Sequence, residues 1–424
     1  MTRPFLHRMQ RRFLFSGLVA ALALAAGACA DQTPTLSGED QFPPGSIPVT
    51  REVILPASEF IRTLGSFSGY TRASDAPYVV VANQYGGALD AHGLALFRAF
   101  PTKVTYVRNG ATREDTLFTY ADSRLVLGVD SAAVAGAPLT VQVWEATERW
   151  DPFSATWTMA VDTAGERLPW TEPGGTRGAL IAQATLADVD ADSLVITLPG
   201  AAVTRLADST SNGIVLTIAE TGKRIELSDL LLRAAIKPDS ANPDTTIIVT
   251  VGTGPFRTTV YTPEQPDAPL GTFGVGGIRS ARTLLELDLE QTVPGCAVGQ
   301  TCAEVPIGEV QLNQVAILLR PATVPSGFGA LNRVPIAMRL VEEPELGRVA
   351  PLGQTSLDRD VTFAPGDTVV VLPITSLTAT LAANDSIPRT FALVSEIAGI
   401  DAPPTFGAAF FEPAARLRII YTLP

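Results

Sequence analysis

Short runs of alternating or continuous hydrophobic residues recur along most of the chain, and turn-forming residues separate them. Val, Ile, Thr and Leu dominate these runs, and Gly, Pro, Asn or Asp follows nearly every one. This pattern is typical of β-strands. The clearest predicted strands are 78–81, 94–100, 139–144, 193–198, 213–218 and 247–251.

Helical periodicity is rare in the same pattern. One modest helical candidate spans 227–235. Many short strands without intervening helices favour antiparallel sandwiches or barrels over a parallel α/β sheet. We therefore expect an all-β fold.

The hydrophobic pattern of the first half recurs in the second half. The run 192–199 is echoed by 367–373, and both end at a proline. Three further matches occur in the same order: 86–100 with 276–289, 213–218 with 390–395, and 247–251 with 417–422. Because ordered matches indicate an internal repeat, we predict two tandem antiparallel β-sandwiches of jelly-roll type, 51–252 and 253–424.

The first 28 residues follow a different pattern. An uncharged run from 13 to 28 follows a positively charged start, which is the layout of a secretory signal peptide. The positive residues are Arg3, Arg8, Arg11 and Arg12. An uncleaved anchor is disfavoured because the run is short for a spanning helix and rich in Ala and Gly. We therefore expect an exported protein.

The cysteine after this run is a candidate site of lipid attachment. Ala26, Gly27 and Ala28 lead directly into Cys29. This stretch resembles the lipobox of bacterial lipoproteins, which implies that Cys29 carries acyl chains such as palmitate. We therefore expect the membrane as a partner and the bacterial cell envelope, at the outer membrane, as the location. Ordinary cleavage after an A-x-A site is the alternative.

The composition predicts a flexible tether and argues against nucleic acid as a partner. Segment 29–50 is polar and rich in Pro, Gly, Ser and acidic residues, so it cannot repay the entropy of ordering and is predicted to be flexible. The formal net charge is −12, and it becomes −16 once the four arginines of the signal peptide are removed. Such a surface repels phosphate backbones, so we expect no nucleic-acid partner.

The remaining two cysteines suggest a disulfide. Cys296 and Cys302 form an even pair in a compartment that permits oxidation. Their C-x5-C spacing does not match a CxxC redox motif. Since His92 is the single histidine beyond the signal peptide, a zinc site of the His/Cys kind lacks ligands. We predict a local disulfide between these cysteines.

Three sequence motifs lie near the beginning, the middle and the end of the predicted sandwiches. They are RTLLELDL at 282–289, WDPFSATW at 150–157 and PAARLRIIY at 413–421. They resemble the DNRLRE-type domains, which are jelly-roll modules on bacterial surface proteins related to carbohydrate-binding modules. The resemblance implies a jelly-roll fold and a surface-binding role, and it places 150–157 in the structural core. The second half lacks the tryptophan motif.

Catalytic patterns are weak. No G-x-S-x-G elbow accompanies His92, which lies in a turn-like stretch. Two acidic pairs, Glu145 with Glu148 and Glu342 with Glu343, offer the two carboxyls of a glycosidase, but such pairs are expected in a chain with 43 acidic residues. We therefore expect no catalytic residues and a protein that is not an enzyme.

All four tryptophans fall within a short stretch. Trp144, Trp150 and Trp157 are candidate glycan-binding residues, with Trp170 nearby, because flat indoles stack on pyranose rings. Tryptophan also fills the centre of β-sandwiches, and this structural role is the favoured alternative.

An acidic run offers a candidate calcium loop. Asp188, Asp190 and Asp192 supply oxygen at alternate positions, which makes a structural Ca²⁺ one alternative, with no other cofactor expected. The Gly and Glu that a calcium loop requires are replaced by Ser193 and Pro199, so a solvated turn before a strand is favoured.

These observations predict a non-enzymatic cell-envelope lipoprotein with a binding or adhesion role. Glycan recognition is the leading hypothesis, and it rests on analogy of fold. One alternative is a structural or assembly component that docks on another envelope protein. A second is a degenerate glycoside hydrolase.

Overall fold

The structure is a computed structural model, and part of the chain is described. The described residues are 49–67, 78–133, 138–163, 165–186, 188, 190–262, 273–276, 282–288, 292–296, 301, 303–323, 334–353, 361–363, 367–384, 387–394, 408–412 and 415–423. The predicted signal peptide, Cys29, the predicted tether up to residue 48 and Cys302 lie outside them. Within the described residues, no helix has the length and the hydropathy needed to cross a bilayer.

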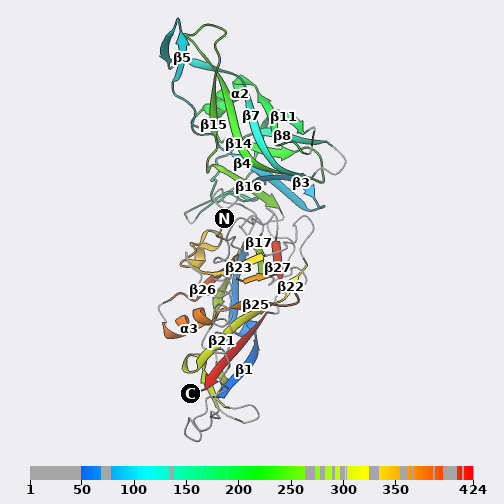
Figure 1. The fold of residues 1–424 in the computed structure, drawn as a ribbon, viewed down its shortest axis with the longest axis vertical. Coiled ribbons are helices and arrows are strands. Elements are labelled where there is room, and N and C mark those ends of the chain that lie inside the picture. The colour runs from blue at the N-terminus through cyan, green and yellow to red at the C-terminus, as the bar shows by residue number, and fades with distance from the viewer. Residues whose placement is uncertain are drawn as a thin grey trace, which may run out of the picture. The chain divides into compact units, whose positions relative to one another are not determined.

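Antiparallel sheets dominate the described residues, which confirms the predicted all-β class (Figure 1). One ten-stranded sheet system is built from residues 79–262. The elements in this range are β3 (Val79–Tyr85), β4 (Leu89–Ala95), β5 (Val104–Arg108), β6 (Ala111–Asp115), β7 (Phe118–Ala133), β8 (Leu139–Ala146), β9 (Met159–Thr163), β10 (Glu166–Pro169), β11 (Arg177–Leu186), β12 (Ser193–Leu198), α2 (Gly200–Ala207), β13 (Ile214–Ile218), β14 (Lys223–Pro238), β15 (Ile247–Gly252) and β16 (Arg257–Thr262). The pairs β5–β6 and β9–β10 form two separate hairpins, and the other strands form the ten-stranded sheet.

The other described elements come from both ends of the chain. They are β1 (Val49–Pro56), η2 (Ala57–Glu59), β2 (Ile61–Phe67), β17 (Phe273–Gly276), β18 (Arg282–Leu287), β19 (Thr292–Pro294), β20 (Glu304–Pro306), η3 (Ile307–Glu309), β21 (Gln311–Leu319), β22 (Pro321–Ala322), β23 (Val334–Leu340), η4 (Pro344–Val349), β24 (Val361–Phe363), β25 (Val370–Pro373), α3 (Thr375–Ala383), β26 (Thr390–Val394), β27 (Ala408–Phe411) and β28 (Arg416–Leu423). Their main sheets have the orders β1-β28-β21-β25 and β2-β18-β26-β23-β24.

Alternation along the strands builds the core of the large sheet. In β12, Leu194, Ile196 and Leu198 are buried, whereas the residues between them are exposed. Inward-facing residues of β3, β7, β8, β13 and β14 join them in one hydrophobic cluster, and α2 adds Val203 and Leu206. The sheet therefore wraps one core with its inner face and leaves its outer face for other contacts.

The same strand order occurs twice. In the large sheet the order β3-β14-β7-β12 parallels β1-β28-β21-β25, and β3-β4-β13-β8 parallels β2-β18-β26-β23. A helix lies between the corresponding strands in both cases, α2 between β12 and β13 and α3 between β25 and β26. The strand pairing therefore repeats one topology, with β28 in the place of β14.

This pairing departs from the predicted boundaries at 51 and 253. Strands β1 and β2, expected in the first sandwich, pair with β28 and β18. Strand β16, expected in the second sandwich, pairs with β4 in the large sheet. The boundaries 51–252 and 253–424 are therefore wrong as sheet boundaries, because 79–262 is inserted after the first strands of the other copy. The match of 247–251 with 417–422 does not pair equivalent strands either, because β28 corresponds to β14 and not to β15.

The predicted helix at 227–235 is also wrong. These residues belong to β14, which pairs with β7 along one edge and with β3 and β15 along the other (Figure 1). Leu227, Leu230, Leu232 and Ala234 all face the core. Pairing on both edges outweighs the local helix propensity.

Candidate functional site

Two of the four tryptophans are core residues. Trp150 and Trp170 are 5% and 6% exposed and pack in a cluster on the outer side of β4, β8 and β13. Their indole nitrogens donate to the carbonyl oxygens of Asn212 at 2.8 Å and Thr156 at 2.9 Å. Burial with a satisfied N–H is the structural role of tryptophan, so Trp150 is unsuited to stack on a ligand.

Trp144 lies at the edge of this cluster and is only partly buried. Its indole Nε1 donates to Oγ1 of Thr217 at 2.9 Å. The guanidinium carbon of Arg177 lies 5.4 Å from the ring centroid, within the range of a cation–π contact. Trp144 therefore has a fixed aromatic ring with the guanidinium group of Arg177 over it.

Polar side chains continue the outer surface of the same strands. Oγ1 of Thr217 donates to the amide oxygen of Gln142 at 3.2 Å, and Nε2 of Gln142 donates to the amide oxygen of Gln183 at 3.3 Å. Two residues further along these strands, the hydroxyls of Thr140 and Thr185 are 3.0 Å apart. The strand register places these pairs opposite one another on β8, β11 and β13.

We call this surface the Trp144 face. It consists of Thr140, Gln142, Trp144, Arg177, Gln183 and Thr185, and the buried hydroxyl of Thr217 links Trp144 to Gln142. It combines an aromatic ring with amide, hydroxyl and guanidinium groups on rigid strands. These groups can donate and accept hydrogen bonds with a polar ligand while the ring packs against its apolar face.

Trp157 lies outside the Trp144 face and contacts His92. The two rings have centroids 4.8 Å apart and are tilted by 48°. Nδ1 of His92 lies 2.7 Å from the carbonyl oxygen of Gly174. Gly174 has φ = +85°, and a Cβ there would lie 2.7 Å from both His92 and Trp157. The close approach of the loop therefore requires glycine at this position.

His92 is on β4 and not in the turn expected from the sequence. Burial lowers its pKa from 6.5 to about 4, the hydrogen bond to Gly174 opposes this shift, and the charge of Arg177 adds to it. The imidazole is therefore neutral near pH 7. A buried imidazole bonded to a backbone carbonyl fits a packing role better than a catalytic one.

Two of the four candidate glycosidase carboxyls, Glu145 and Glu148, are held by separate hydrogen-bond partners. Glu145 accepts a hydrogen bond from Arg205 at 3.2 Å, and Glu148 accepts one from the backbone of Thr171 at 3.1 Å. Desolvation raises the pKa of Glu148, but hydrogen bonds from Thr171 and Thr176 bring it below its ordinary value. A glycosidase acid requires a raised pKa.

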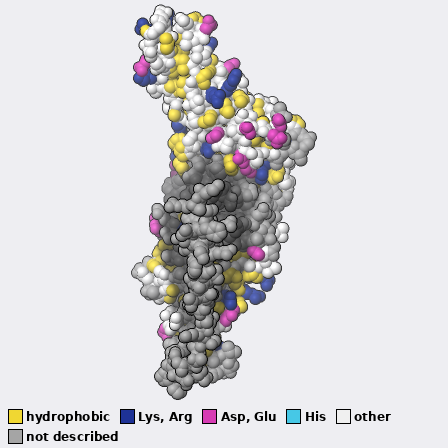
Figure 2. All heavy atoms as spheres, viewed as in Figure 1, with side chains coloured by type: hydrophobic (Ala, Val, Ile, Leu, Met, Phe, Trp, Pro, Cys, Tyr) yellow, Lys and Arg dark blue, Asp and Glu magenta, His cyan; other side chains and the backbone are white. Residues whose placement is uncertain are grey.

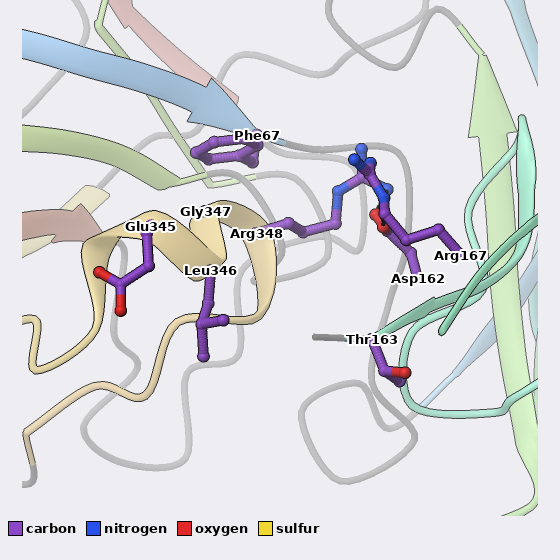
Figure 3. Close-up of a pocket in the computed structure, with 8 residues that line it drawn as sticks. All are labelled: Phe67, Asp162, Thr163, Arg167, Glu345, Leu346, Gly347 and Arg348. Atoms are coloured by element: carbon purple, nitrogen blue, oxygen red, sulfur yellow. Dashed lines mark hydrogen bonds and ion pairs between the residues drawn. The ribbon is translucent and has the colours of Figure 1, made fainter. Parts of the chain in front are cut away.

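A cavity of about 300 Å³ lies elsewhere, at β9, β10, η4 and the end of β2 (Figure 3). The ring of Phe67 forms part of its wall, and the side chains of Asp162, Arg167 and Arg348 converge on it. Nε of Arg167 donates to Oδ1 of Asp162 at 2.7 Å, and Nη1 of Arg348 lies 3.2 Å from Oδ2. Both carboxylate oxygens of Asp162 therefore already face an arginine.

This cavity was not predicted, because its residues are far apart in the sequence. Arg348 and Asp162 are buried to a similar degree, whereas Arg167 is mostly exposed. An ion pair of this kind can be structural, since removing one partner leaves the other charge buried. The Trp144 face has more groups facing outward and is the stronger candidate for ligand recognition.

The acidic run forms a turn. Oδ1 of Asp188 accepts a hydrogen bond from the backbone N–H of Asp190 at 3.0 Å, and the carbonyl of Asp192 accepts one from Val129. Among the described residues, no three His, Cys, Asp or Glu side chains are grouped so that they could hold a metal ion. The hydrogen bond from Asp190 to Asp188 fits the favoured interpretation of the run as a turn before β12, and a calcium site at Asp188, Asp190 and Asp192 stays a prediction.

Cys296 is disulfide-bonded. It directly follows the β19–β20 ladder, in which Pro294 pairs with Glu304 and the N–H of Gly295 donates to the carbonyl of Ala303 at 3.1 Å. Cys302 lies outside the described residues. The pairing of these two cysteines stays a prediction.

Comparison with known proteins identifies no family. No family model and no curated protein matches the chain. A crystal structure of a predicted secreted protein from Parabacteroides distasonis ATCC 8503 aligns with 87% of this chain and 99% of its own, at 12% identity and a TM-score of 0.22. A triple jelly roll structure from an archaeal virus aligns with 78% of this chain and 90% of its own, at 9% identity and a TM-score of 0.12. Scores this low support no inference about function, and the resemblance to DNRLRE domains stays a prediction.

Proposed function

We propose that this protein is a non-catalytic lipoprotein of the bacterial cell envelope and that it recognises glycans. The observation that carries the proposal is the Trp144 face, where Trp144 lies beside the amide side chains of Gln142 and Gln183. The signal peptide layout and the lipobox-like sequence before Cys29 support export and lipid attachment.

The chemistry of the Trp144 face suits a sugar. A pyranose ring has an apolar face of C–H groups that packs on an indole, and its edge carries hydroxyls that both donate and accept hydrogen bonds. Gln142, Gln183 and Thr185 provide groups of both kinds, and the strand register fixes their spacing. Because these side chains stand on β-strands, little ordering entropy is lost on binding.

A role without catalysis fits the titratable groups near this face. His92 has a lowered pKa and is bonded to a backbone carbonyl, while Glu148 has a lowered pKa as well. Neither group is prepared to act as a general acid near pH 7.

A glycan array probed with the mature chain tests this proposal. We expect binding to a restricted set of oligosaccharides and loss of that binding in Gln142→Ala/Gln183→Ala. Gln311→Ala/Gln314→Ala, on β21, is the matched control because it also removes one exposed and one half-buried glutamine. The absence of any bound glycan, with the protein folded, would overturn the proposal and favour the alternative of a structural component that docks on another envelope protein.

A further inference from the structure

Two arginines lie directly opposite one another on the outer face of the large sheet. The register pairs Arg233 on β14 with Arg124 on β7. Arg124 is also paired with Thr197 on β12, and Arg233 with Thr250 on β15. A continuous row of Thr, Arg, Arg and Thr therefore crosses four strands, and we call it the arginine row.

The arginine row is exposed, and its arginines have no acidic partner among the described residues. All four of its side chains are exposed, and the residues that flank each arginine on its own strand face the core. Neither Arg124 nor Arg233 makes a hydrogen bond or an ion pair with the residues that the structure describes. The carboxylate of Asp122, two residues along β7, accepts a hydrogen bond from the backbone of Gly200 instead.

Such an arrangement is unfavourable for the isolated protein. Like charges directly opposite on neighbouring strands repel one another, because their Cβ atoms are only about 5 Å apart. In a chain with a net charge of −12, many acidic side chains exist that could neutralise them. The described residues do not offset this repulsion, whereas an external anion between the two guanidinium groups would.

Apolar side chains border the arginine row. Val195 and Ile248 are 47% and 58% exposed, on the two outer strands of the same four. Val126 and Leu231 face each other in the next row and are half-buried. Basic side chains among exposed hydrophobic ones are visible over β7, β14 and β15 (Figure 2). A ligand that lies across the row therefore meets both cations and apolar surface.

We propose that the arginine row binds the anionic groups of an acidic polysaccharide. This inference rests on the proposed glycan-binding function and specifies the ligand class. Guanidinium groups form paired hydrogen bonds with carboxylate or sulfate oxygens, Thr197 and Thr250 supply hydroxyls beside them, and the C–H faces of sugar rings pack on Val195 and Ile248. A repeating anionic polymer fits an open row on a sheet because it needs no enclosed pocket.

Polygalacturonate is the first probe, because its fully methyl-esterified form has the same backbone without the charge. Binding of both polymers to the mature chain is measured by biolayer interferometry. We expect binding to polygalacturonate, at least about tenfold weaker binding to the esterified polymer, and a similar loss in Arg124→Gln/Arg233→Gln, since about 1.4 kcal/mol corresponds to a factor of ten. Dextran sulfate distinguishes sulfate from carboxylate as the preferred anion.

A double variant with the same change of charge elsewhere on the surface is the control. Arg113→Gln/Arg416→Gln removes the same charge from exposed positions on β6 and β28, and it should bind as the unchanged protein does.

Equal binding of both polymers, or unchanged polygalacturonate and dextran sulfate binding in Arg124→Gln/Arg233→Gln, would overturn the inference and leave the Trp144 face as a neutral glycan site. Arginine-dependent binding only to phosphatidylglycerol vesicles would also overturn it, in favour of a lipid headgroup. If no glycan binds at all, the proposed function fails as well.

Discussion

The indole nitrogen of Trp144 donates a hydrogen bond to the hydroxyl of Thr217 at 2.9 Å. Thr217 is 4% exposed, and its own hydroxyl proton is directed at Gln142. This chain of donors sets the orientation of the Trp144 ring and of the Gln142 amide together. The Trp144 face is therefore organised before any ligand arrives, which reduces the entropic cost of binding.

His92 should make stability depend on pH. Because burial lowers its pKa from 6.5 to about 4, the unfolded chain takes up a proton in this window and the folded protein does not. The free energy of unfolding should therefore fall as the pH decreases from about 6.5 to about 4, by on the order of 2 to 3 kcal/mol. Urea unfolding of the mature chain and of His92→Gln at several pH values isolates this contribution.

A direct measurement accompanies that comparison. His92 is the single histidine after residue 28, so one imidazole signal is expected in a proton NMR titration of the mature chain. A pKa near 6.5, together with parallel pH profiles for the two proteins, would contradict the buried environment of His92.

The arginine row should cost stability in the absence of ligand. Repulsion between directly opposite like charges is worth about 0.2 to 1 kcal/mol. Either Arg124→Gln or Arg233→Gln alone should therefore raise the free energy of unfolding by an amount in this range, and the double variant should add little more. Urea unfolding measures all three. A loss of stability in both single variants would show that the arginine side chains stabilise the sheet.

The predicted Cys296–Cys302 disulfide closes a short loop. Cys302→Ser should lower the free energy of unfolding by about 2 kcal/mol, because a short loop removes little entropy from the unfolded chain. Mass spectrometry under non-reducing conditions should find no alkylatable thiol in the unchanged mature protein and one thiol, at Cys296, in the variant. A variant in which Cys296 still resists alkylation would show that its disulfide partner is another cysteine.

Much of the secondary structure could be predicted from the local hydrophobic pattern. The alternation in 193–198 predicted β12 with its full length, and 139–144 and 213–218 lie at β8 and β13. The run 94–100 was less accurate, since β4 ends at Ala95 and the buried Leu96 and Phe97 continue beyond it. Burial by tertiary contacts produces an apolar run there without a strand.

Non-local contacts could not be predicted in the same way. Nothing in the local pattern of 61–67 indicates that it pairs with 282–287, across more than 200 residues of sequence. The same holds for Arg124 opposite Arg233, whose meeting depends on the register of β7 and β14. The division of the tryptophans was likewise open, because the burial of Trp150 depends on tertiary contacts, including its hydrogen bond to the carbonyl of Asn212.

Lipid attachment at Cys29 is expected from the sequence before it. Cys29→Ser should release the protein from the membrane fraction and abolish labelling with radioactive palmitate, since the thiol carries the acyl group. Fractionation of expressing cells measures the first effect, and Cys302→Ser is a control that leaves the anchor intact. Retention in the membrane with unchanged labelling would contradict the anchor.

The central claim is that Trp144 contacts a glycan, and tryptophan fluorescence tests it most directly. The strongest oligosaccharide from the glycan array is titrated into the mature chain, into Trp144→Phe and into Trp157→Phe, which alters a partly buried tryptophan outside the Trp144 face. We expect a saturable change in emission for the unchanged protein and for Trp157→Phe. Trp144→Phe should lose the change and bind at least about tenfold more weakly, as calorimetry can confirm, because stacking and its fixed geometry are lost. An undiminished fluorescence change and unchanged affinity in Trp144→Phe would contradict the account.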